Sequence, residues 1–66
     1  MQITVNGKPA VLPESSTAQE LIQRLELSGK RIALEVNGTI VPRSTYHSHQ
    51  FHEGDHVEVV HAIGGG

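Results

Sequence analysis

The stretch TAQELIQRL, residues 17–25, carries the strongest local structural signal in this chain. Thr17 is suited to cap a helix, and Glu20, three residues later, completes a capping box. The apolar side chains that follow recur at helical spacing and form one stripe, made of Ala18, Leu21, Ile22 and Leu25. Gly29 is a suitable stop. The stretch therefore predicts one amphipathic helix that spans about Thr17–Leu27.

A β-hairpin is predicted ahead of this helix. Residues Gln2–Asn6 alternate between polar and apolar side chains, which is typical of a half-buried strand. Asn6-Gly7 is a favoured two-residue hairpin turn, because both residues tolerate positive φ. A second strand is expected over Lys8–Leu12, and Pro9 near its start favours an edge position in the sheet.

Three extended segments are predicted after the helix: Arg31–Val36, Thr39–Val41 and His56–Ile63. An Asn37-Gly38 turn joins the first two of them. The polar, histidine-rich residues 43–52 lie before the last one, with a weak signal for a helical turn near Ser44. Tyr46 and Phe51 are the side chains in this segment that we expect to anchor it to the core.

The order of these elements, hairpin, helix, strands, predicts an α+β fold of the β-grasp or ubiquitin-like type. We expect a mixed sheet of four to five strands packed on one helix, with the first and last strands adjacent in its middle. The helix stripe then covers the inward side chains of the sheet, which are Ile3, Val5, Ile32, Leu34, Val57 and Val59.

Size and composition exclude several classes of function. A chain of 66 residues forms one small core and buries only about 60% of its unfolded surface, which leaves little room for a closed active site. The chain has no Cys, a formal net charge of -2 and no basic cluster, so thiol chemistry, disulfides and nucleic-acid binding are not expected. No apolar run approaches the length of a membrane span. We therefore expect a cytoplasmic protein that is not an enzyme and has no catalytic residues of its own.

The sequence ends in Ile63-Gly64-Gly65-Gly66. Glycines add no side-chain contacts and lose the most entropy on ordering. We therefore expect a folded domain over residues 1–63 and a flexible glycine tail over 64–66, slim enough to enter a narrow channel of a partner. The last reactive group is the Gly66 carboxylate, which becomes an electrophile once it is joined to AMP.

These features together make the chain similar to the ThiS family, the sulfur carrier proteins of thiamine biosynthesis. The resemblance covers the whole chain and rests on five segments: Gln2–Asn6, Thr17–Leu27, Ile40-Val41-Pro42-Arg43, Gly54-Asp55 and Gly65-Gly66. It implies a β-grasp fold and a terminal glycine that a ThiF-type adenylyltransferase activates with ATP. Sulfur from a donor protein then forms a thiocarboxylate, which thiazole synthase (ThiG) uses. By position, the modified residue is Gly66, no cofactor is bound, and the ATP is consumed by the partner enzyme.

The tail residues Gly65, Gly64 and Ile63 are expected to contact these partners, together with Val60. Val60 lies on the strand face opposite Val57 and Val59, and it is expected to form a small exposed patch with Val11 and Val41.

Other functions share part of this evidence. The small subunit of molybdopterin synthase and the ubiquitin-like protein modifiers have the same fold and tail chemistry. A different alternative is a passive interaction module that binds a metal through His47, His49, His52 and His56. The spacing of these histidines matches no compact zinc motif, and we expect no metal site.

Overall fold

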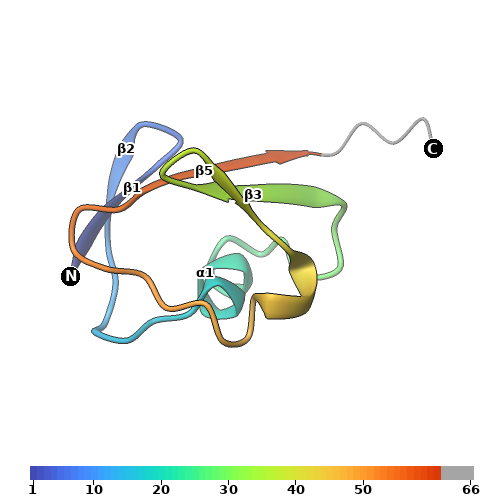
Figure 1. Ribbon diagram of the computed structural model, residues 1–66, viewed down its shortest axis with the longest axis horizontal. Helices are drawn as coiled ribbons and strands as arrows, with labels where there is room; N and C mark the ends of the chain where they lie inside the picture. The colour runs from blue at the N-terminus through green and yellow to red at the C-terminus, as the bar shows by residue number, and fades with distance from the viewer. Residues whose placement is uncertain (62–66) are drawn as a thin grey trace.

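The computed structural model describes residues 1–61 of the chain. Its elements are β1 (Gln2–Val5), β2 (Lys8–Val11), α1 (Ala18–Arg24), β3 (Ile32–Val36), β4 (Thr39–Val41), the 3₁₀ turn η1 (Arg43–Thr45) and β5 (His56–His61). This is the predicted order of elements, including the helical turn near Ser44 (Figure 1). Within residues 1–61, no helix is long and apolar enough to cross a membrane.

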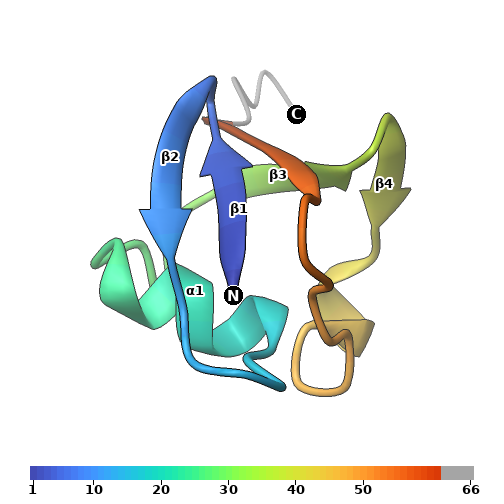
Figure 2. The same cartoon turned by 90° about the vertical axis from the view of Figure 1, so that its left-hand side faces the viewer.

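The five strands form one mixed sheet in the order β2-β1-β5-β3-β4. The parallel pair β1 and β5 joins the two halves of the sheet, and the other neighbouring strands are antiparallel. The predicted contact between the first and last strands is confirmed, and so is the edge position of β2. Helix α1 lies across one face of the sheet and leaves the other face open (Figures 1 and 2).

The predicted capping box starts α1. The Thr17 hydroxyl accepts a hydrogen bond from the Glu20 backbone N–H at 3.3 Å, and Glu20 Oε1 accepts one from the Thr17 backbone N–H at 2.8 Å. These two bonds satisfy donors that have no partner inside the helix, so residues 17–20 fix the beginning of α1.

The helix ends earlier than predicted, at Arg24 rather than near Leu27. Glu26 adopts a left-handed conformation with φ 59°, its N–H donates to the Gln23 carbonyl, and the Leu27 N–H donates to the Ile22 carbonyl. This pair of bonds is a Schellman motif, which closes the helix before Gly29 is reached. Leu25 consequently leaves the buried stripe on which it was expected, and 39% of its surface is exposed.

The histidine-rich segment packs its backbone against the start of α1. The N–H groups of Ala18 and Gln19 donate to the carbonyls of His49 (2.8 Å) and Tyr46 (3.0 Å), and the Phe51 N–H donates to the Ser16 carbonyl (3.0 Å). Helix donors without an internal partner are thus satisfied by a distant part of the chain. Figure 2 shows this segment beside α1, below the sheet.

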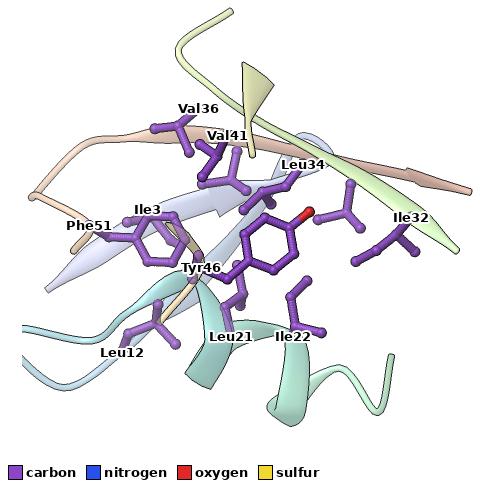
Figure 3. Packing of buried hydrophobic residues seen from close by; sticks show 13 residues of the cluster. Ile3, Leu12, Leu21, Ile22, Ile32, Leu34, Val36, Val41, Tyr46 and Phe51 are labelled. Carbon is purple, nitrogen blue, oxygen red and sulfur yellow. The ribbon is translucent and has the colours of Figure 1, made fainter. Parts of the chain in front are cut away.

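The core lies between α1 and the covered face of the sheet (Figure 3). Tyr46 and Phe51 are buried in it, which confirms their predicted role as anchors. Its largest fully buried side chains, Ile3, Leu34 and Val57, come from β1, β3 and β5. The core consists of Ile3, Leu12, Ala18, Leu21, Ile22, Ile32, Leu34, Val36, Val41, Tyr46, Phe51, Val57 and Val59.

We predict that Thr17→Ala lowers the free energy of unfolding by about 1 kcal/mol, because it removes the cap acceptor from α1. Ser44→Ala is the matched control, since Ser44 is an exposed residue of η1. Chemical denaturation followed by circular dichroism measures both variants. Equal stability of Thr17→Ala and the natural chain would show that the cap does not stabilise the fold.

Candidate functional site

The residues expected to carry the chemistry, Gly66, Gly65, Gly64 and Ile63, lie outside the described residues, as does the expected boundary between the domain and its tail. The structure does describe the strand that leads to them. β5 runs through the middle of the sheet and ends, within the described part, at His61, which pairs with Ile32 of β3. The part of the site that the structure describes is therefore β5 itself, together with the contacts that hold this strand in the domain.

The beginning of β5 is fixed by a network around the buried Asp55 carboxylate. Asp55 Oδ1 accepts a hydrogen bond from Asn37 Nδ2 at 3.0 Å, and Asp55 Oδ2 accepts one from the His52 N–H at 2.8 Å. Asn37 Oδ1 in turn accepts from the His56 N–H at 2.9 Å. The Gly54-Asp55 motif therefore ties the last strand to the Asn37-Gly38 turn between β3 and β4.

Further along β5, the side chain of Asn6 extends the pairing after β1 has ended. Its Oδ1 accepts from the Val59 N–H at 2.8 Å, and its Nδ2 donates to the Val59 carbonyl at 3.1 Å. A side-chain amide thus bonds both backbone groups of Val59, much as another strand residue would. The sequence indicated Asn6 as the last polar residue of a strand and as a turn residue, and gave no sign of this contact, because the contact spans 53 positions.

Beyond Val59, the described part of β5 pairs with β3 through Ala33 opposite Val60 and Ile32 opposite His61. Figure 1 shows β5 running alongside β3 past the end of β1. The end of β5 is therefore held by fewer partners than its middle. The strand has partners on both sides where it crosses the core, and within the described residues it is paired only with β3 at Val60 and His61.

Val60 lies on the open face of the sheet with 48% of its surface exposed, as the sequence predicted. The expected patch around it is wrong in two respects. Val41 is buried, because it pairs with the core residue Leu34 and shares its face. Val11 is exposed but pairs with Gln2, whereas Val60 lies beyond the residues of β5 that pair with Thr4 and Val5, so the two valines are at opposite ends of the sheet.

Ile40 is the apolar residue of β4 on the open face, with 65% of its surface exposed. The sequence contains the signal that identifies it. A two-residue turn at Asn37-Gly38 pairs residue 36 with 39 and therefore 35 with 40, which places Ile40 on the face opposite Leu34 and Val36.

On the open face of the sheet, the side chains of two carboxylates, Glu35 and Glu58, lie between Ile40 and Val60. Glu35 pairs with Ile40 on one side and with Glu58 on the other, and Glu58 precedes Val60 by two residues on β5. Like charges directly opposite each other destabilise a sheet. The open face thus combines exposed apolar side chains with a concentration of negative charge.

The histidines of residues 47–56 are placed separately. The His49 ring packs edge-on against Phe51 with ring centroids 5.7 Å apart, and His56 Nδ1 lies 3.0 Å from the Thr4 hydroxyl. In the part of the chain that the structure describes, no three His, Asp or Glu side chains are grouped so that they could hold a metal ion.

A mixed five-stranded sheet with a parallel central pair and one covering helix is a β-grasp domain, the ubiquitin-like class. In the sequence, two residues separate the described end of its last strand, His61, from the run of glycines at 64–66. Residues 2–66 match the sequence profile of the ThiS family, and the chain belongs to that family.

Individual relatives agree with this assignment. The chain is 31% identical over 65 residues to the sulfur carrier protein ThiS of Bacillus subtilis, a match that covers 97% of this chain and 98% of that one. The crystal structure of the thiamine biosynthesis protein ThiS from Geobacter metallireducens superposes with a TM-score of 0.86 at 33% identity, with full coverage of both chains. The expected sulfur-carrier role in thiamine biosynthesis is confirmed, and this chain is a carrier rather than an enzyme.

A third relative is a thiazole synthase from Magnetococcus marinus. It is 38% identical over 66 residues, which are all of this chain but only 20% of that protein. A segment similar to this domain therefore forms a fifth of a longer thiazole synthase.

We predict that Glu58→Gln raises the free energy of unfolding by about 0.2–1 kcal/mol, because it removes the repulsion with Glu35 across the strands. Glu14→Gln is the matched control, since it removes an equal charge from an exposed side chain beside the N-terminal amine and should give no gain. Urea denaturation at low salt measures the difference. A destabilised Glu58→Gln variant would contradict the repulsion.

Proposed function

We propose that this chain carries sulfur as a thiocarboxylate on its terminal residue, Gly66. The carboxylate attacks the α-phosphorus of ATP in a partner enzyme, which gives an acyl-adenylate and releases pyrophosphate. Hydrosulfide (HS⁻), supplied by the sulfur donor, then attacks the carbonyl carbon: the new C–S bond forms, the C–O bond to AMP breaks and AMP leaves, so that one carboxylate oxygen is replaced by sulfur. The observation that carries this proposal is the match to the ThiS family, which runs through Gly66.

The composition of the chain supports the same chemistry. A sulfur carrier without any Cys has no thiol on which to hold sulfur, and a terminal thiocarboxylate needs none. Gly65 and Gly64 present no side chains beside the reactive group, so they and Ile63 suit a narrow channel in a partner. The anchoring of β5 by Asn6 and Asp55 supplies a rigid base behind that end.

Three partners follow from this scheme: a ThiF-type adenylyltransferase, a sulfur donor protein and thiazole synthase. The chain itself binds no cofactor, and the adenylyltransferase consumes the ATP. The relative from Magnetococcus marinus supports the thiazole synthase partner, because there a ThiS-like segment and a thiazole synthase share one chain. A process that consumes ATP and forms a vitamin precursor also fits a cytoplasmic location.

The open face of the sheet is the surface that we propose for docking the adenylyltransferase. Val60 and Ile40 supply exposed apolar area, and Glu35 and Glu58 supply negative charge between them. A partner surface with apolar side chains and basic groups complements this face. Val60 also lies close to the end of β5, so docking there holds the partner near the glycines.

We predict that the natural chain, incubated with ATP, a ThiF-type adenylyltransferase and a sulfur donor, exchanges one oxygen for sulfur at Gly66. Intact-mass measurement and fragmentation of the product locate the change. A chain whose C-terminal carboxylate is replaced by a carboxamide is the matched control, because every side chain is retained and only the reactive group is lost. It should give neither an AMP adduct nor a sulfur adduct.

The carboxamide chain should also unfold at the same temperature as the natural chain. Sulfur transfer to the carboxamide chain, or a sulfur adduct elsewhere than on Gly66, would refute the proposed chemistry. A natural chain that forms neither adduct would favour a passive interaction module instead.

We predict that Val60→Asp raises the KM of the adenylyltransferase for this carrier by roughly fivefold or more, because it puts a further charge into the apolar contact. Val11→Asp is the control, since Val11 is 73% exposed at the far end of the same face. Pyrophosphate release at varied carrier concentration gives both values. Equal effects of the two substitutions would show that docking does not use the surface around Val60.

A further inference from the structure

A cleft of about 400 Å³ lies on the helix side of the molecule, away from the open face of the sheet. It is bounded by the second half of α1, the turn at residues 27–30, the start of β3 and the segment around η1. This size is at the lower end of the range for sites that hold small molecules. Neither the tail chemistry nor the docking face uses this cleft.

The polar groups of the cleft are cationic or neutral. Lys30, Arg43 and His47 line it, and none of its lining residues within the described chain is acidic. Two of the five Lys and Arg residues of a chain with net charge -2 are therefore gathered here. Such a site attracts an anion, because no fixed carboxylate competes for its donors.

Arg43 is held in place at this cleft. Its Nη2 donates a hydrogen bond to the Lys30 carbonyl at 3.0 Å, which joins η1 to the turn before β3. The remaining guanidinium donors stay available for a ligand. A pre-positioned guanidinium loses less side-chain entropy on binding than a free one.

The floor of the cleft is apolar, and the Tyr46 side chain also lines the cleft. Ile22, Leu27 and Ile32 contribute apolar surface. The Tyr46 ring lies between α1 and β3, and its hydroxyl oxygen points away from α1 toward β3 (Figure 3). Among the hydrogen bonds formed within residues 1–61, none involves this hydroxyl. An apolar floor beside cationic groups suits a ligand that has an apolar part and an anionic part.

We propose that this cleft binds a small phosphomonoester with an apolar body. The phosphate would take donors from Lys30, Arg43 and His47 at the rim, and the body would lie on Ile22 and Ile32. A planar guanidinium matches two phosphate oxygens, and the ammonium adds a point charge. The inference goes beyond the carrier role and does not depend on the glycine tail.

The test uses phenyl phosphate as the probe, with inorganic phosphate and phenol as its two halves. Titration of the ¹⁵N-labelled full chain should shift the amide signals of the residues that line the cleft. Phenyl phosphate should bind more tightly than either half, because only it reaches both the rim and the floor. The chain with a C-terminal carboxamide should bind it equally well, so that this result is independent of the sulfur chemistry.

Lys30→Gln should weaken phenyl phosphate binding by roughly threefold to tenfold, since it removes one charged donor at an exposed rim. Lys8→Gln is the matched control on β2, outside the cleft, and its effect should be small because salt screens distant charges. Both side chains are exposed, so the fold is retained. Three results would overturn the proposal: shifts outside the cleft only, equal losses in both variants, or inorganic phosphate binding as tightly as phenyl phosphate.

Discussion

The parallel pairing of β1 with β5 is the constraint on which the rest of this structure depends. It joins residues near the two ends of the described chain, with the Thr4 N–H donating to the Asp55 carbonyl and the Asn6 N–H to the Val57 carbonyl. Parallel neighbours cannot be joined by a tight turn. The chain between them therefore contains α1, which covers the sheet, and β3 with β4, which complete it. The same pairing places the strand that leads to the glycines in the middle of the domain, where its backbone is held from both sides.

This arrangement explains how a domain with so small a core serves a chemical function. The core does not surround a reaction site; it holds one strand firmly along most of its length. Asp55 and Asn37 fix the beginning of β5, and Asn6 fixes its middle. The proposed reactive carboxylate then travels to the active sites of other proteins. The absence of Cys agrees with a carrier whose sulfur is held on the backbone terminus rather than on a side chain.

The candidate surface could be predicted from the sequence only in part. Val60 was placed correctly, because alternation along a single strand is a local property. The expected exposure of Val41 is wrong: the register set by the Asn37-Gly38 turn pairs Val41 with the core residue Leu34, and the residues next to Val41 in the sequence do not show this pairing. The opposition of Glu35 and Glu58 likewise exists only across two paired strands. The histidine-rich segment resembled a metal-binding loop in composition, whereas its backbone carbonyls satisfy the first N–H groups of α1.

The sequence by itself determined the elements whose signals are short in range: the capping box at Thr17, the two Asn-Gly turns, the alternating strands and the order that defines the β-grasp fold. It also determined the family, through motifs spread over the whole chain. Only the tertiary structure decided how Asn6 holds Val59 and that Glu35 lies opposite Glu58. It also gathered Lys30, Arg43 and His47 around one cleft. The physical reason is distance along the chain, because these contacts join residues whose pairing is set by the packing of the whole sheet and helix and by no local preference.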